Sequence, residues 1–179
     1  HASSRTRDCI GGGYGPSTTD TIDFVSFSST GNATDFGNLT VARYGLGALS
    51  NQIRGVYSGQ DGGNVMDYIT ISSEGNAVDF GDCTVGYIQR GLGNTTRGIM
   101  MGGAPNSGSN RTNVCDFITI ATTGNAIDFG DLAANMMGYR SCGCASPTRA
   151  VKMGGYNPGQ SNDMCSVEIA SLGNPIDFG

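Results

Sequence analysis

The sequence predicts an all-β protein built from four tandem repeats. Thirty of its 179 residues are glycine and only 14% are charged; this composition disfavours long helices, because glycine weakens a helix interior. One heptapeptide, Gly-Asn-x-x-Asp-Phe-Gly, recurs four times, at residues 31–37, 75–81, 124–130 and 173–179. Apolar and hydroxyl side chains alternate before the copies, the period-two pattern of a strand with one buried face. Such regular repetition indicates stacked units that share a core.

Each repeat contains an arginine followed by a short apolar run and glycines. These segments start at Arg7, Arg54, Arg97 and Arg149. We expect a short inner strand here, ended by glycines that adopt positive φ or allow close backbone approach. A variable loop rich in Gly, Asn and Ser follows, such as residues 104–113, and loops of this composition are exposed and tolerant of change.

The strongest strand of each repeat lies directly before the heptapeptide. Residues 23–30, 67–74 and 116–123 alternate Phe, Tyr or Ile with Ser or Thr, and residues 165–172 are a diverged fourth copy. The Gly-Asn pair then turns the chain into a third strand, which is expected to pair back as a hairpin.

A fourth, glycine-broken stretch follows the first three heptapeptides, at residues 39–49, 83–92 and 132–144. Its mixed composition predicts an outer edge strand with few packing demands. Four short strands in about 49 residues match one blade of a β-propeller. The sequence therefore predicts one domain, residues 1–179, whose repeats span about 1–47, 48–91, 92–143 and 144–179.

The repeat resembles known families. A strand ending in Gly-Gly, a variable loop and an aromatic-bearing second strand resemble a degenerate kelch repeat, which implies a kelch-like β-propeller. The phrase Asp-Tyr-Ile-Thr-Ile-Ser-Ser-x-Gly-Asn-Ala-x-Asp-Phe-Gly-Asp, at residues 67–82 and again near 116–131, is similar to tandem repeats in virion proteins of tailed phages, particularly those infecting cyanobacteria. The chain departs from the kelch pattern because it contains no Trp.

Four blades are few for a closed ring. The chain opens near the end of an edge strand, because residues 1–7 match residues 48–54, and it stops before a fourth edge strand. Further blades beyond these ends, a small ring that closes imperfectly, or neighbouring chains that supply the missing strand would each complete the array. We expect a longer parent chain or an assembly, so that the sequence is a segment of a larger propeller or fibre.

The repeated charged and aromatic residues favour structural roles. Four copies of Asp-Phe-Gly without a catalytic-loop signature argue against the magnesium-binding motif of protein kinases. We expect each Asp to accept backbone N–H groups in a turn and each Phe to fill the core between blades. These residues are Asp35, Phe36, Asp79, Phe80, Asp128, Phe129, Asp177 and Phe178.

The four repeated arginines allow two interpretations. They either line a central channel as a ring of cations that binds an anionic sugar or carboxylate, or each pairs with a repeat carboxylate such as Asp23, Asp67 or Asp116. We expect the pairing, as a bidentate link between blades.

Metal and cofactor sites have little support in the sequence. The only histidine is His1 and no CxxC pair occurs, which disfavours zinc. Asp-Phe-Gly-Asp turns at residues 79–82 and 128–131 match no known calcium loop. We expect the six cysteines to be small buried apolar residues, with disulfides as the alternative, and Cys142 and Cys144 to be edge-strand thiols. No cofactor is expected.

These features predict association rather than catalysis. The chain has no internal His to act as a general base and no Gly-x-Ser-x-Gly elbow. A net charge of −5 leaves no basic face for nucleic acid, and no apolar stretch is long enough for membrane insertion. We expect a non-enzymatic structural or interaction module.

The phage resemblance implies a virion surface protein, as a tail fibre or capsid decoration, located on the virion or extracellularly. Its partners would be other virion or filament subunits, further copies in a homo-oligomer or larger assembly, or a host surface glycan. A secreted bacterial adhesin or filament subunit and a glycan-active propeller enzyme are the alternatives. Candidate ligand or partner residues lie in or beside the variable loops, where aromatic faces and amide groups can hold a sugar. They are Tyr14, Tyr57, Asn106, Ser107, Tyr156 and Asn157.

Overall fold

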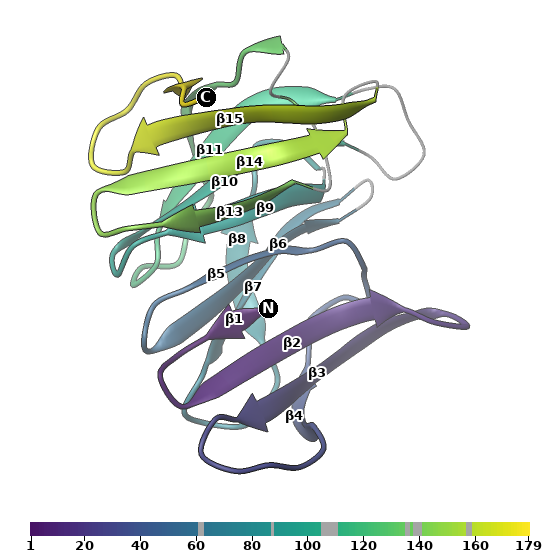
Figure 1. The fold of residues 1–179 in the computed structure, drawn as a ribbon. Helices are drawn as coiled ribbons and strands as arrows, with labels where there is room; N and C mark the ends of the chain where they lie inside the picture. The colour runs from purple at the N-terminus through teal and green to yellow at the C-terminus, as the bar shows by residue number, and fades with distance from the viewer. Residues whose placement is uncertain (61–62, 87, 105–110, 135–136, 138–140, 157–158) are drawn as a thin grey trace.

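The chain forms four four-stranded antiparallel sheets in succession, as a computed structural model shows (Figure 1). The structure describes residues 1–60, 63–86, 88–104, 111–134, 137, 141–156 and 159–179. In this part of the chain each sheet uses four consecutive strands in chain order. The predicted all-β fold of four tandem, blade-like, four-stranded repeats is therefore confirmed. None of the described segments is a helix long and apolar enough to cross a bilayer.

Every sheet is a meander in which each strand pairs with the next along the chain. Sheet 1 contains β1 (Ala2–Ser3), β2 (Arg7–Tyr14), β3 (Thr18–Ser26) and β4 (Thr34–Asn38). Sheet 2 contains β5 (Gly47–Ser50), β6 (Arg54–Gln60), β7 (Gly63–Thr70) and β8 (Val78–Asp82). Sheet 3 contains β9 (Ile88–Gly93), β10 (Arg97–Ala104), β11 (Thr112–Thr119) and β12 (Ile127–Asp131). Sheet 4 contains β13 (Cys142–Ala145), β14 (Arg149–Tyr156), β15 (Gln160–Glu168) and β16 (Ile176–Asp177).

The second strand of each sheet is bulged at its glycines. The register with the third strand shifts there in all four sheets, and one glycine at each bulge has left-handed backbone, with φ between 57° and 68°. These residues are Gly12, Gly59, Gly102 and Gly154. Because L side chains rarely adopt this conformation, glycine is required there, as the sequence pattern indicates.

The sheets stack in chain order and share three hydrophobic cores. One core lies between sheets 1 and 2, the second between sheets 2 and 3, and the third between sheets 3 and 4. Figure 1 shows the amino-terminal sheet and the carboxyl-terminal sheet at opposite ends of the stack. Within the described residues, no hydrogen bond or core cluster joins sheet 1 to sheet 4. The array is therefore open.

The glycine-broken stretches pair differently from what the sequence predicts. They form β5, β9 and β13, which pair with the sheet that follows them instead of the sheet before, and they contact one another along the stack. The predicted edge position is confirmed, because each of these strands lies at the edge of its sheet. Few packing demands hold for β13, whose residues are all exposed, but that expectation was wrong for β5 and β9, where Leu49 and Leu92 are buried. A Cβ on Gly91 of β9 would lie 2.5 Å from the carbonyl oxygen of Ala48 in β5, so glycine is there because the backbones approach closely.

Candidate functional site

The repeated heptapeptide forms a joint between neighbouring sheets, which we call the Gly-Asn joint. In it, the Gly-Asn pair of one sheet binds the last strand of the preceding sheet. Between sheets 1 and 2, Gly75 N–H donates to the carbonyl of Phe36 at 2.8 Å, and Ala77 N–H donates to that of Asn38 at 2.8 Å. The N–H of Asn38 donates in turn to Asn76 Oδ1 at 3.1 Å. These three bonds extend the hydrogen bonding of one sheet into the next.

The same joint recurs along the stack. Between sheets 2 and 3, the bonds run from Gly124 N–H to Phe80, from Ala126 N–H to Asp82, and from Asp82 N–H to Asn125 Oδ1. Between sheets 3 and 4, Gly173 N–H donates to the carbonyl of Phe129 at 3.0 Å and Asp131 N–H donates to Asn174 Oδ1 at 2.9 Å. Pro175 stands where the other two joints have Ala77 and Ala126. Because proline has no backbone N–H, this joint lacks the hydrogen bond that the alanine donates in the other two.

The last glycine of the heptapeptide provides room for the joint. Gly37, Gly81 and Gly130 have φ of 144°, 135° and 147°. A Cβ on Gly81 would lie 2.5 Å from the carbonyl oxygen of Gly124, a backbone atom that cannot move aside cheaply. The heptapeptide therefore has two contact ends: its Gly-Asn binds the sheet before, and its Phe-Gly receives the sheet after. Sequence reasoning interpreted Gly-Asn only as a hairpin turn, although the presence of both residues in all four copies was a signal of a further role.

The heptapeptide phenylalanines occupy two environments. Phe36, Phe80 and Phe129 are buried between sheets and meet an aromatic ring of the neighbouring strand edge-on, with ring centroids 5.9 to 6.1 Å apart. Phe178, in the last sheet, is 49% exposed. The expectation that all four fill the core was therefore wrong for Phe178, because no described sheet follows it.

The first three repeated arginines link neighbouring sheets through an aromatic ring and a backbone carbonyl, and Arg7 also pairs with Glu74 of sheet 2, Nη2 to Oε1, at 3.5 Å. Each of the first three guanidinium groups lies 4.5 Å from the centroid of an aromatic ring in its own sheet and donates to a backbone carbonyl of the next sheet. The pairs are Arg7 on Phe24 and Ile71 O, Arg54 on Tyr68 and Ile120 O, and Arg97 on Phe117 and Ile169 O. The expected bidentate pairing with repeat aspartates was wrong, because the planar guanidinium stacks on the aromatic ring instead.

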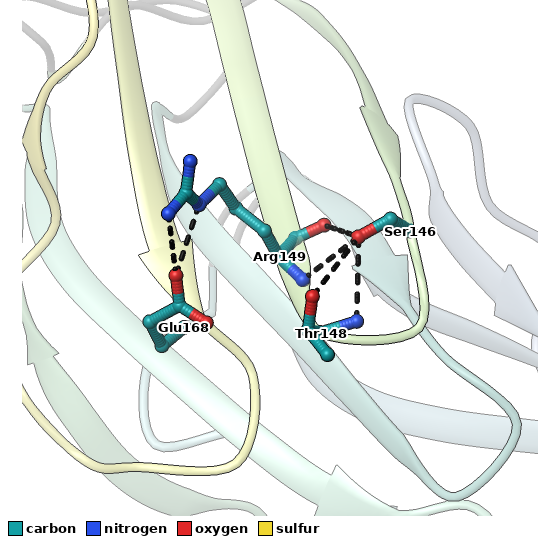
Figure 2. A network of polar contacts seen from close by, with 4 residues as sticks. All are labelled: Ser146, Thr148, Arg149 and Glu168. Atoms are coloured by element: carbon teal, nitrogen blue, oxygen red, sulfur yellow. Dashed lines mark hydrogen bonds and ion pairs between the residues drawn. The ribbon is translucent and has the colours of Figure 1, made fainter.

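The fourth arginine behaves differently. Ser166 occupies the position of the aromatic ring in sheet 4, and Arg149 instead binds Glu168 of the same sheet through Nε and Nη2 at 2.9 and 2.8 Å. Figure 2 shows this pair beside the β13–β14 turn, where Ser146 Oγ accepts the N–H of Thr148 and of Arg149. Both partners are half-exposed, so this exposed pair contributes little to stability.

Two of the repeat aspartates are held by the linkers between sheets. Asp67 is fully buried and accepts hydrogen bonds from Arg43 Nη2 at 2.8 Å and from the hydroxyl of Thr40 at 2.5 Å. Asp116 accepts the N–H and the hydroxyl of Thr84 at 2.9 and 2.7 Å. Arg43 also donates to the carbonyl of Val65, and its burial lowers its pKa, while the adjacent Asp67 opposes that shift. Sequence reasoning missed Arg43, because the stretches at residues 83–92 and 132–144 have no arginine at the matching position.

The heptapeptide aspartates lie on the surface. Asp128 Oδ1 and Asp177 Oδ1 each accept the N–H of the glycine two residues later, at 3.2 Å. Asp35 and Asp79 are exposed. Among the described residues, no group of three or more His, Cys, Asp or Glu side chains is positioned to hold a metal ion.

The candidate ligand residues do not form one site in the described part of the chain. Tyr14 is 72% exposed at the end of β2 and lies beside Tyr44, with ring centroids 5.2 Å apart. Tyr156 is exposed at the end of β14, with Arg111 over its ring. Asn106, Ser107 and Asn157 lie outside the described residues.

Tyr57, a candidate ligand residue expected in or beside a variable loop, lies inside a strand. It is fully buried in β6, and its hydroxyl donates to the carbonyl of Cys9 in sheet 1 at 3.0 Å. Gly11 makes this possible, because a Cβ there would lie 3.1 Å from the Tyr57 ring. Burial raises the pKa of the Tyr57 hydroxyl, so it stays protonated as a donor. Tyr57 therefore joins sheets 1 and 2 and is not available to a ligand.

The cysteines are free thiols in two classes. Cys9, Cys83, Cys115 and Cys165 are buried, and Cys142 and Cys144 are exposed on β13. Burial raises the pKa of Cys9 to about 11 and that of Cys83 and Cys115 to about 12. These thiols remain protonated at neutral pH, and the thiolate is the reactive form.

We expect two of the six thiols, the exposed Cys142 and Cys144, to react rapidly with Ellman's reagent in the native chain, because the other four are buried, and all six to react after unfolding in guanidinium. The double variant Cys142→Ser/Cys144→Ser is expected to show no rapid reaction. More than two rapid thiols in the folded wild-type chain would contradict this burial pattern.

An open groove of about 330 Å³ is lined by residues of β5, β9 and β13, the first strands of sheets 2, 3 and 4. Arg90 Nε and Ser141 Oγ are buried and have no hydrogen-bond partner in the described part of the chain. The described side chains that line the groove include three ionisable ones, His1, Arg90 and Cys142.

These contacts define a tandem-repeat β protein whose blade-like sheets are joined by one recurring motif. Neither a protein-family model nor a curated protein sequence matches the chain.

Proposed function

We propose that this chain is a non-enzymatic structural module that assembles with other subunits on a virion surface or in another extracellular structure. The observation that carries the proposal is the pair of uncovered faces at the ends of the stack. Ile10 and Phe27 are 48% and 59% exposed at one end, and Phe178 is half-exposed at the other. The equivalent faces of the internal sheets are covered by a neighbouring sheet. Exposed apolar surface of this kind marks sites of protein association.

The roles of the repeated polar residues support a structural module. Asp67 and Asp116 hold linkers, and three of the four arginines hold neighbouring sheets together. Side chains fixed in this way are not free to transfer protons or bind substrate. The proposed location is what the resemblance of residues 67–82 to repeats of tailed-phage virion proteins implies.

Attachment to a host glycan has less support. Of the six candidate residues, only Tyr14 and Tyr156 are described and exposed, and they belong to the first and last sheets. A sugar site usually gathers several polar groups around an aromatic face. We therefore place assembly ahead of glycan binding.

The proposal is tested by measuring the molar mass of the full chain by light scattering after size-exclusion chromatography, over loading concentrations of about 1 to 200 µM, where moderate affinities are visible. We expect the mass to increase with concentration and the increase to persist in high salt, because apolar burial is not screened. A single-chain mass throughout the range would show the assembly role to be wrong.

A further inference from the structure

The amino-terminal face of sheet 1 is one half of the interface that joins the sheets internally. Ile10 occupies the position of Tyr57, Met100 and Lys152, and Phe27 that of Ile71, Ile120 and Ile169. Those six residues are all buried against the preceding sheet, whereas Ile10 and Phe27 are exposed. The Gly-Asn pair of this sheet is also uncovered: Gly31 and Asn32 are exposed, and neither makes a hydrogen bond within the described part of the chain.

The carboxyl-terminal face of sheet 4 is the other half. Phe178 occupies the position of Phe36, Phe80 and Phe129, which are buried against the following sheet. Phe178 thus provides the carbonyl that accepts the glycine N–H in the three internal joints, and Gly179 the glycine that leaves room for it. The remaining bonds of the internal joints use the residue that follows this glycine. Arg149 is turned onto Glu168 of its own sheet, whereas the first three arginines donate to a carbonyl of the sheet that follows.

We propose that copies of this chain associate head to tail, sheet 1 of one copy stacking on sheet 4 of the next. The N–H of Gly31 in the first copy then donates to the carbonyl of Phe178 in the second, and Arg149 of the second exchanges Glu168 for the carbonyl of Phe27 of the first. This inference rests on the proposed function and names its partner as a second copy.

The internal interfaces show why a second copy fits. Their contact residues vary, since Tyr57, Met100 and Lys152 occupy one position in different sheets, so the hydrogen bonds of the Gly-Asn joint and the buried Phe define the interface more than any exact set of side chains. Both halves are present on one chain at opposite ends (Figure 1). Such a heterologous contact repeats until a ring closes or a filament grows. Because Ser166 replaces the aromatic ring, the contact is weaker than the internal ones.

The test uses one charged substitution at each end: Ile10→Glu for the amino-terminal face and Phe178→Glu for the carboxyl-terminal face. Both residues are exposed in the single chain, so circular dichroism is expected to show an unchanged fold. The matched control is Ile127→Glu, which changes a residue of similar exposure, 59%, on β12. Sedimentation velocity of each full-length chain, over about 1 to 200 µM, measures association.

We expect each end variant to weaken association at least about tenfold, because a carboxylate buried in an apolar contact is costly, and the control to associate like wild type. An equimolar mixture of the two end variants is expected to form a dimer, since each retains the face that the other has lost. Association that is unchanged in the end variants, or a mixture that stays monomeric, would overturn head-to-tail stacking and leave the assembly role standing. A wild-type chain that never associates would overturn both.

Discussion

Replacement of Asp67 by alanine is expected to lower the free energy of unfolding by about 3 to 5 kcal/mol, the usual cost of removing one partner from a buried ion pair. The side chains of Asp67 and Arg43 are both fully buried and lie 2.8 Å apart. Without Asp67, the Arg43 guanidinium has no carboxylate partner, and an arginine does not escape by losing its proton. The Thr40 hydroxyl loses its acceptor as well.

Urea unfolding followed by circular dichroism measures this loss. Arg43→Met is expected to be similarly destabilising, whereas the double variant Arg43→Met/Asp67→Ala is expected to recover part of the loss, because it leaves no unpaired charge. The matched control within the chain is Glu168→Ala, which breaks the half-exposed pair with Arg149 and is expected to cost less than about 1 kcal/mol. Equal losses for Asp67→Ala and Glu168→Ala would contradict the role assigned to burial.

The repeat architecture could be predicted because its signals are local. Alternation of apolar and hydroxyl residues before each heptapeptide predicted one strand in each repeat, and the Gly-Asn pair predicted the hairpin that follows. The observed strands β3, β7, β11 and β15 begin four or five residues earlier than predicted and end four residues earlier. The alternation and the Gly-Asn pair both depend on residues only a few positions apart. The positive φ at the bulges was predictable for the same reason, because glycine is the residue that adopts this local backbone conformation without strain.

The contacts between repeats could not be predicted from these signals. The stretches that form β5, β9 and β13 lie between two repeats, and the sequence does not say which neighbour they pair with. Tyr57 was expected beside a variable loop and open to a ligand, but its burial depends on Gly11, which lies in another sheet and leaves room for the ring. Arg43 has no counterpart in the repeat that would have marked it as buried.

The four heptapeptides have nearly the same sequence and were predicted to have the same environment, whereas their position in the stack decides whether their Phe is buried. A residue that faces the following sheet is buried in sheets 1 to 3 and exposed in sheet 4. The same Phe can therefore be compared in two settings, covered by a following sheet at Phe80 and uncovered at Phe178.

Phe80→Ala is expected to lower the free energy of unfolding by about 3 to 5 kcal/mol, as large-to-small substitutions of buried aromatics do. Phe80 is 2% exposed in the core between sheets 2 and 3, where its ring also contacts Tyr68 edge-on. In an array in which each sheet contacts only its neighbours, a weakened interface also reduces the cooperativity between the two halves. A broader urea transition is expected in addition to the lower midpoint.

The control is Phe178→Ala, the same substitution in the same heptapeptide without a covering sheet. Measured at low micromolar concentration, where association is negligible, it is expected to cost less than about 1 kcal/mol, because the side chain is already half in water. The difference between the two variants isolates the contribution of the neighbouring sheet from that of the local hairpin. If Phe178→Ala proved as costly as Phe80→Ala, the phenylalanine would stabilise its own hairpin, and the stack would not depend on burial between sheets.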